Sequence, residues 1–287
     1  MTEGLGRARL QLLAAALLFS TGGAAIKATT LSSAQIAGFR SGVAVLAVLL
    51  LAPSARRLPG ARAWLVGVAY AATVILYALA NKLTTAANTI FLQSTAPLYV
   101  LLAAPWLLRE RIARRDLGFV AVAAVGLALF FVGAEPPRTT APDPATGNLL
   151  AAASGIAWAA TIIGLRWMGS APAENAAPIH AVVAGNTLAF AACLPFALPV
   201  VSFTPADAAT VLYLGALQIA LPYLFVAAAV RRLPALEISL VLLVEPVLNP
   251  LWAFALHGEV PGVLAMTGGA ILLAATFAKA WLDARGS

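Results

Sequence analysis

Long apolar stretches recur along the whole chain, and each is close to twenty residues in length. An α-helix of that length crosses about 30 Å of hydrocarbon. Ten such stretches lie near residues 8–27, 33–52, 63–81, 85–108, 116–133, 148–168, 177–200, 208–229, 234–256 and 261–282. Since none alternates apolar and polar residues with a period of two, the pattern predicts ten membrane-spanning helices rather than the strands of a barrel.

The first stretch allows a second interpretation. Arg7 and Arg9 precede an apolar run, and a secretory signal peptide begins in the same way. Nine further apolar stretches follow, however, as in a polytopic membrane protein. We therefore favour an uncleaved first membrane helix over a cleaved signal peptide.

The composition supports a bilayer as the solvent of this chain. It is 62% hydrophobic and only 10% charged, whereas about a quarter of the residues of a soluble domain are charged. A water-soluble fold would have to expose much of this apolar surface. Cys193 is the only cysteine and cannot form an internal disulfide, and His180 and His257 cannot form a metal site by themselves. We expect neither a metal nor a cofactor.

The distribution of Lys and Arg predicts the orientation in the membrane. With the N-terminus inside, fourteen of the eighteen cationic residues fall in cytoplasmic segments. Lys27, Lys82 and Arg138 fall outside, and Arg40 lies within a helix. We predict a multi-pass protein of the inner (plasma) membrane with both termini in the cytoplasm. The net charge of +7 is spread over the loops, which fits anionic lipid better than nucleic acid.

One stretch of the sequence occurs twice. "APLYVLLAAPWLLRE" at 96–110 and "EPVLNPLWAFALHGE" at 245–259 agree at five of fifteen positions, and "LLAAA" occurs at 12–16 and at 149–153. These matches divide the chain into two five-helix repeats, 1–140 and 141–287. An odd number of helices makes the second repeat enter the membrane from the opposite side, and such inverted repeats enclose a site near the midplane. The sequence thus predicts an all-α polytopic membrane protein, with two inverted five-helix repeats around a central cavity.

The repeated stretches also carry a family resemblance. The chain resembles the EamA-type branch of the drug/metabolite transporter superfamily in its five plus five spans, in "GFRSGVAVLAVLLLAP" of the second helix, and in the closing motifs of the fourth and ninth helices. The resemblance covers essentially the whole chain and differs at "LRE", where the family usually has Gly before Glu. The inverted repeats predict alternating access, and the resemblance implies export of amino acids, including aromatic ones, or of related metabolites. Export of drugs or other metabolites is the alternative.

Two ionisable residues lie deep in the predicted helices. Arg40 is about 11 Å from the outer end of the second helix, and Glu245 is about 16 Å from the inner end of the ninth. Both are therefore near the midplane, where charged groups are costly. We expect them to form an ion pair. The pair is either a static lock between two helices or a site where Glu245 titrates or binds a substrate ammonium group.

Polar and aromatic residues within the spans complete the candidate site. Amides and hydroxyls can bind the charged ends of an amino acid, and aromatic rings can bind its side chain. The candidate substrate-binding residues are Ser20, Tyr77, Asn81, Gln93, Tyr99, Trp158, Gln218 and Glu245. For each polar residue, a hydrogen bond between helices is the alternative role.

Prolines and charged residues elsewhere have structural interpretations. Pro97 and Pro246 lie midway along the fourth and ninth helices and can kink them. Lys27 and Lys82 are expected to extend to the headgroups, although Lys82 can also meet a substrate carboxylate near an outer gate. Glu110 and Glu259 follow helix ends, where we expect them to cap helices or bridge loops.

Other protein classes find less support. The sequence has no GxSxG or HExxH motif, which disfavours an intramembrane enzyme. A channel or a lipid-handling protein stays open as an alternative to a transporter. The expected partners are a small-molecule substrate and the lipid bilayer, and the sequence indicates no particular number of subunits.

Overall fold

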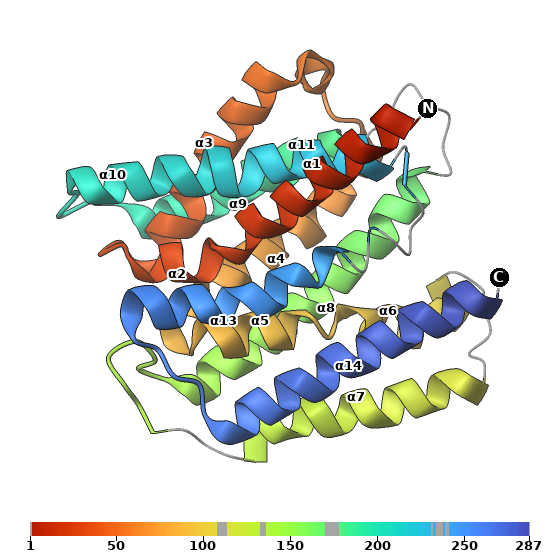
Figure 1. Cartoon of the computed structure of the whole chain (residues 1–287). Helices are drawn as coiled ribbons and strands as arrows, with labels where there is room; N and C mark the ends of the chain where they lie inside the picture. Colours follow the sequence, from red (N-terminus) through yellow and green to blue (C-terminus); the bar gives the residue numbers. More distant parts are fainter. Residues whose placement is uncertain are drawn as a thin grey trace.

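The structure is a computed structural model that describes residues 2–107, 114–132, 136–169, 178–230, 232–233, 238 and 241–286. Helices make up nearly all of these ranges, and the only strand-like feature among them is one isolated bridge between Arg138 and Ala141. The helices form one bundle, with both chain termini at the right-hand end in Figure 1. The predicted all-α class is confirmed.

Eight helical segments are long and apolar enough to cross a membrane. They are Leu5–Lys27, Ser33–Leu51, Ala61–Leu83, Ala86–Ala103, Pro144–Leu165, Pro178–Ala197, Pro205–Val226 and Val263–Leu282. Each coincides with one of the predicted spans, so the chain is a polytopic membrane protein.

The other two predicted spans are shorter in the structure. Of the stretch 116–133, residues Asp116–Val132 form an apolar helix that falls below the length of the eight. Of the stretch 234–256, helix α13 covers Val244–His257, and residues 234–237, 239 and 240 lie outside the described ranges. Ten spans are therefore not confirmed.

The elements follow the predicted order of the two repeats. The first repeat contains α1 (Thr2–Ser20), α2 (Gly22–Lys27), α3 (Ser33–Leu51), the 3-10 helix η1 (Pro53–Arg56), α4 (Ala61–Leu83), α5 (Ala86–Gln93), α6 (Ala96–Leu107) and α7 (Arg114–Val132). The second contains α8 (Pro144–Gly169), α9 (Pro178–Ala197), α10 (Pro205–Leu212), the π-helical η2 (Tyr213–Ala220), α11 (Leu221–Val230), α13 (Val244–His257) and α14 (Val263–Gly286).

Side chains cap several helices at the ends of spans. Ser32 accepts a hydrogen bond from the Gln35 backbone N–H at 3.2 Å, and the Gln35 side chain accepts one from the Ser32 N–H at 3.0 Å. Such a capping box satisfies amides that have no partner within the helix. At the start of α8, Asp143 Oδ1 accepts a hydrogen bond from the Thr146 N–H. Hydrogen bonds with the side chain and the backbone of Thr146 lower the pKa of the Asp143 carboxyl.

Three predicted spans are interrupted near their middle. The first is broken at Thr21, and the fourth at Ser94 and Thr95. In the ninth, Leu243 forms a turn before α13 begins. Pro97 and Pro246 therefore lie in the first turns of α6 and α13, where a missing N–H costs little because helix starts leave their N–H groups unpaired.

Contacts between helices are nearly unchanged when the two repeats are exchanged. Helix α3 packs against its counterpart α9, and α7 packs against its counterpart α14. Likewise α8 packs against α4 and α5, just as α1 packs against α11 and α13. Such a pattern is that of two related halves around a two-fold axis.

Corresponding helices run in opposite directions. Lys27, at the end of the first span, donates a 2.8 Å hydrogen bond to the Thr84 carbonyl just after α4. The Asp143 N–H, just before α8, donates to the Leu83 carbonyl at 3.1 Å. The sixth span thus begins where the first ends, at the end of the bundle opposite the termini (Figure 1). We call this the distal end. The domain boundary at residue 140 stays a prediction.

Candidate substrate site

The interruption of the first span is the centre of a buried polar cluster. Gln218, in η2, donates a 3.3 Å hydrogen bond from Nε2 to the Phe19 carbonyl. A Cβ added to Gly22 would lie 2.6 Å from this Nε2, and one added to Gly23 would lie 2.8 Å from Asn249 Oδ1. Any side chain at these two positions would displace the amides, so the glycines permit this close approach.

Helix α13 supplies one face of the cluster. Glu245, Asn249 and Trp252 are spaced four and three residues apart and lie on the same side of the helix. Trp252 donates from Nε1 to the Ser20 hydroxyl at 2.9 Å, and Asn249 donates from Nδ2 to the Tyr77 hydroxyl at 3.3 Å. These bonds connect α13 to α1 and to α4.

Three amide oxygens in the cluster are buried without a hydrogen-bond partner among the described residues. They are Asn81 Oδ1, Asn249 Oδ1 and Gln218 Oε1. Asn81 is fully buried, and its Nδ2 donates to the Tyr77 carbonyl at 3.0 Å. Buried acceptors are seldom left unpaired, so unpaired ones in a polar cluster point to a function.

Arg40 is buried on α3, with 2% of its surface exposed. Its Nη2 donates a 2.8 Å hydrogen bond to the Val74 carbonyl, and its Nε has no acceptor among the described residues. The guanidinium is close enough to Tyr70, Tyr77, Tyr223 and Cys193 to interact with them electrostatically.

The predicted ion pair between Arg40 and Glu245 is wrong. Both side chains are described, and no ion pair connects them. Tyr77 and Tyr223 each lie close enough to both side chains to interact electrostatically with them. Among the described residues, no Lys or Arg side chain forms an ion pair with Glu245, which is half-buried.

The structure brings together five of the predicted substrate-binding residues: Ser20, Tyr77, Asn81, Gln218 and Glu245. Gln93 instead donates to the Ser154 hydroxyl at 2.8 Å, in the contact between α5 and α8. Tyr99 and Trp158 are half-buried on α6 and α8, and no described hydrogen bond connects them to the cluster. A binding role for these three stays a prediction.

Sequence reasoning missed three aromatic residues of this region. Trp252 bonds Ser20, and the ring of Tyr223 lies 5.5 Å from that of Tyr70, centroid to centroid. Tyr223 also packs edge-on against Phe19 at 5.2 Å. The spacing of Trp252 from Glu245 along α13 could have identified Trp252, whereas nothing in the sequence distinguishes the two tyrosines.

A second polar group lies at the distal end. Lys27 pairs with Glu259 at 3.0 Å, and the two side chains are only 5% and 2% exposed. Glu259 also accepts from the Ala86 N–H at the start of α5, which confirms its expected capping role. The expected extension of Lys27 to the headgroups is wrong, because this carboxylate holds it inside.

Lys82 points inward as well and donates to the Thr29 carbonyl at 2.6 Å. Glu110 lies outside the described residues.

Neither polar group resembles a metal site. Across the ranges that the structure describes, no three His, Cys, Asp or Glu side chains come together in a way that could hold a metal ion.

Comparison with known proteins identifies the family. The model of the EamA-like transporter family matches residues 7–132 and 145–278, which are the two repeats. The chain therefore belongs to the EamA-like transporter family, a group of membrane transporters of the drug/metabolite superfamily. No curated protein sequence matches it.

The fold is also that of a solved protein. One crystal structure is similar with a TM-score of 0.61 and 23% sequence identity, over 97% of this chain and 98% of the other. At this identity the likeness concerns the fold alone. Because members of the family are transporters, a small-molecule substrate and a lipid environment follow, and an enzymatic role is disfavoured.

Proposed function

We propose that this transporter exports amino acids, or related metabolites that carry both an ammonium and a carboxylate group, through the cluster around Gly22 and Gly23. One observation carries the proposal: Arg40 and Glu245 are opposite charges within the spans, yet they are not paired with each other. A charge in this environment is costly without a counter-charge. A zwitterionic substrate supplies a carboxylate to Arg40 and an ammonium group to Glu245.

The surrounding groups support the same assignment. An ammonium group donates three hydrogen bonds, and Glu245 together with the amide oxygens of Asn81 and Asn249 offers acceptors for them. Arg40 suits a carboxylate because its guanidinium donates two parallel bonds to the two oxygens. Trp252 and Tyr223 offer ring faces to the side chain of the substrate. We therefore expect the transporter to accept aromatic amino acids.

Alternating access is the mechanism that fits this arrangement. The predicted orientation puts the termini in the cytoplasm of an inner-membrane protein and makes the distal end the outer side. There Lys27 and Glu259 connect the first, fourth and ninth spans, which belong to both repeats. We infer that this pair holds the outer side closed, and that export requires it to separate after a substrate has entered the central cavity from the cytoplasm.

Counterflow in proteoliposomes tests the proposal. Uptake of labelled phenylalanine is measured in the presence of one of three competitors. These are unlabelled phenylalanine, phenylpyruvate, which lacks the ammonium group, and phenethylamine, which lacks the carboxylate. Each analogue lacks one charged contact, so we expect both to compete at least about tenfold less well than the amino acid. Equal competition by all three would contradict the proposal, and an ohmic current would indicate a channel.

A second candidate is export of an aromatic cationic drug. The ring of Tyr223 lies 5.2 Å from that of Phe19 and 5.5 Å from that of Tyr70, centroid to centroid, and the faces of aromatic rings attract cations. In the same assay, strong competition by phenethylamine with none by phenylpyruvate would favour this candidate. The panel therefore separates the two.

A further inference from the structure

A second site lies away from the central cluster, between α7 and α14. These two helices lie side by side at the lower edge of the bundle in Figure 1. They approach closely at two glycines. A Cβ added to Gly126 would lie 3.1 Å from the Gly268 carbonyl oxygen, and a Cβ added to Gly268 would lie 2.6 Å from the Gly126 carbonyl oxygen. Beyond this contact, nearer the chain termini, a pocket opens between them.

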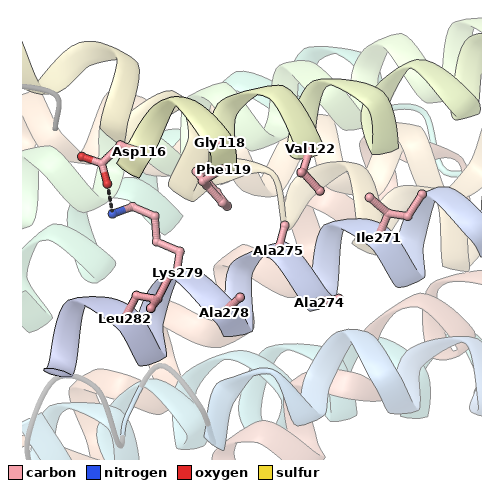
Figure 2. A pocket seen from close by; sticks show the side chains of 10 residues that line it. All are labelled: Asp116, Gly118, Phe119, Val122, Ile271, Ala274, Ala275, Ala278, Lys279 and Leu282. Carbon is pink, nitrogen blue, oxygen red and sulfur yellow. Dashed lines mark hydrogen bonds and ion pairs between the residues drawn. The ribbon is translucent and has the colours of Figure 1, made fainter. Parts of the chain in front are cut away.

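The pocket has a volume of about 490 Å³ and a nearly uniform apolar lining. Figure 2 shows its walls, which are formed by Gly118, Phe119, Val122, Ile271, Ala274, Ala275, Ala278 and Leu282. Asp116 and Lys279 stand at one end and form a 2.9 Å ion pair. The site is therefore an apolar slot with a charged entrance, which is the form of a site for an amphiphile.

The surroundings of the slot indicate that lipid reaches it. Leu117 and Val125 on α7 are 60% and 58% exposed, and Leu282 on α14 is 54% exposed. In a membrane-spanning chain such apolar exposure faces acyl chains. None of the lining residues belongs to the central cluster, so the slot is separate from the proposed path of the substrate.

The sequence next to the charged end of the slot is basic. Lys279 stands at the entrance, and the sequence before and at the start of α7 contains Arg109, Arg111, Arg114 and Arg115. Clusters of Lys and Arg at the end of a span attract anionic lipid headgroups, by about 1 kcal/mol per residue near the surface. The sequence thus favours a negatively charged headgroup over a neutral one.

We propose that this slot binds an anionic phospholipid, with one acyl chain between α7 and α14 and the headgroup phosphate beside Lys279. The chain fills the space that Ala274, Ala275 and Ala278 leave open by their small side chains. The phosphate joins the Asp116–Lys279 pair at the entrance. The lipid fills the gap between the last helices of the two repeats.

Native mass spectrometry of the whole protein tests this proposal. The protein is placed in nanodiscs of phosphatidylglycerol or of phosphatidylcholine and is then released from them in the spectrometer. The number of lipid molecules that stay bound to the protein is counted. We expect the wild type to retain one phosphatidylglycerol in preference to phosphatidylcholine.

Ala275→Trp fills the slot and should weaken retention by about tenfold or more, since each lost methylene contact reduces binding. Lys279→Gln should keep the bound lipid but lose the headgroup preference. Val125→Trp adds the same ring on the lipid-facing side of α7 outside the slot, and should change nothing.

Equal retention of phosphatidylglycerol by Ala275→Trp and wild type would overturn the proposal. So would equal retention of the two lipids by the wild type. If Ala275→Trp does not fold, a phosphatidylglycerol with a photoreactive acyl chain labels the wild type instead. Label in the peptide containing Ala274 and Ala278 supports the site, and label spread evenly over all spans contradicts it.

Discussion

The two copies of the repeated stretch, 96–110 and 245–259, both form a helix over their described parts, Ala96–Leu107 and 245–257, but carry different chemistry. In both, the helix begins after an interruption, at Ser94 and Thr95 in one copy and at Leu243 in the other, with Pro97 or Pro246 in the first turn. The residues that the copies share are mostly apolar, or they are the proline and the final glutamate. Shared positions therefore specify the helix and its start.

The positions that differ carry the residues of the proposed site. Glu245, Asn249 and Trp252 all contact or face the central cluster. In the first copy the corresponding positions are Ala96, Val100 and Ala103, which offer no polar group. A symmetric scaffold thus holds an asymmetric site, and a repeat predicts the fold while its departures from symmetry predict the chemistry.

The largest effect is expected at a position that the copies share. Glu259→Gln leaves Lys27 buried without its counter-charge, which costs about 3–5 kcal/mol. We expect a marked loss of thermal stability in detergent, measured by fluorescence-detected size-exclusion chromatography. The double variant Lys27→Met/Glu259→Gln removes both charges and should recover much of that loss. Equal stability of single variant and wild type would show that the pair contributes little.

Glu245→Gln tests the position where the copies differ most. The variant keeps the size of the side chain and removes its charge, so we expect the protein to fold. Loss of a buried charged contact costs about 3 kcal/mol, which corresponds to a decrease of about 100-fold in the initial rate of amino-acid counterflow. Asp143→Asn removes an exposed carboxylate outside the spans and serves as the control. Normal counterflow in folded Glu245→Gln would contradict the proposed site.

Trp252→Phe removes a single hydrogen bond, the one from Nε1 to Ser20. The expected loss is about 1 kcal/mol, a decrease of about fivefold in apparent substrate affinity. Ser20→Ala removes the same bond from the other side. In a double-mutant cycle the two losses should not add, because they concern one interaction. Full additivity would show that the bond does not contribute.

Val100→Asn introduces into the first copy the amide that the second carries at Asn249. Val100 lies on α6, outside the described cluster, and is only half-buried. We expect counterflow to stay within about twofold of the wild type, which corresponds to less than about 0.5 kcal/mol. A large loss would show that the first copy also forms part of the site.

Much of the fold could be predicted from the sequence because bilayer thickness constrains helix length directly. The predicted spans coincide with the eight long helices, and the opposite directions of α1 and α8 follow from five helices in each repeat. The lengths of the fifth and ninth spans were harder to predict. An apolar run in the sequence does not show where a turn such as Leu243 begins a new helix.

The site could be predicted only in part, because depth along a helix does not give direction around it. Arg40 and Glu245 are expected to pair because both lie near the midplane, yet no ion pair connects them. For the same reason the sequence did not reveal that Glu259 holds Lys27, which is 232 residues away. Packing between helices decides such contacts.

The interruption at Thr21 also has a mechanical consequence. It makes α2 a separate rod of six residues, only about 9 Å long. One end of this rod, at Gly22 and Gly23, touches the amides of the cluster, and the other end is Lys27. Since a rod this short transmits displacement without bending, the proposed mechanism requires that a shift of the amides on substrate entry be passed on to the Lys27–Glu259 pair.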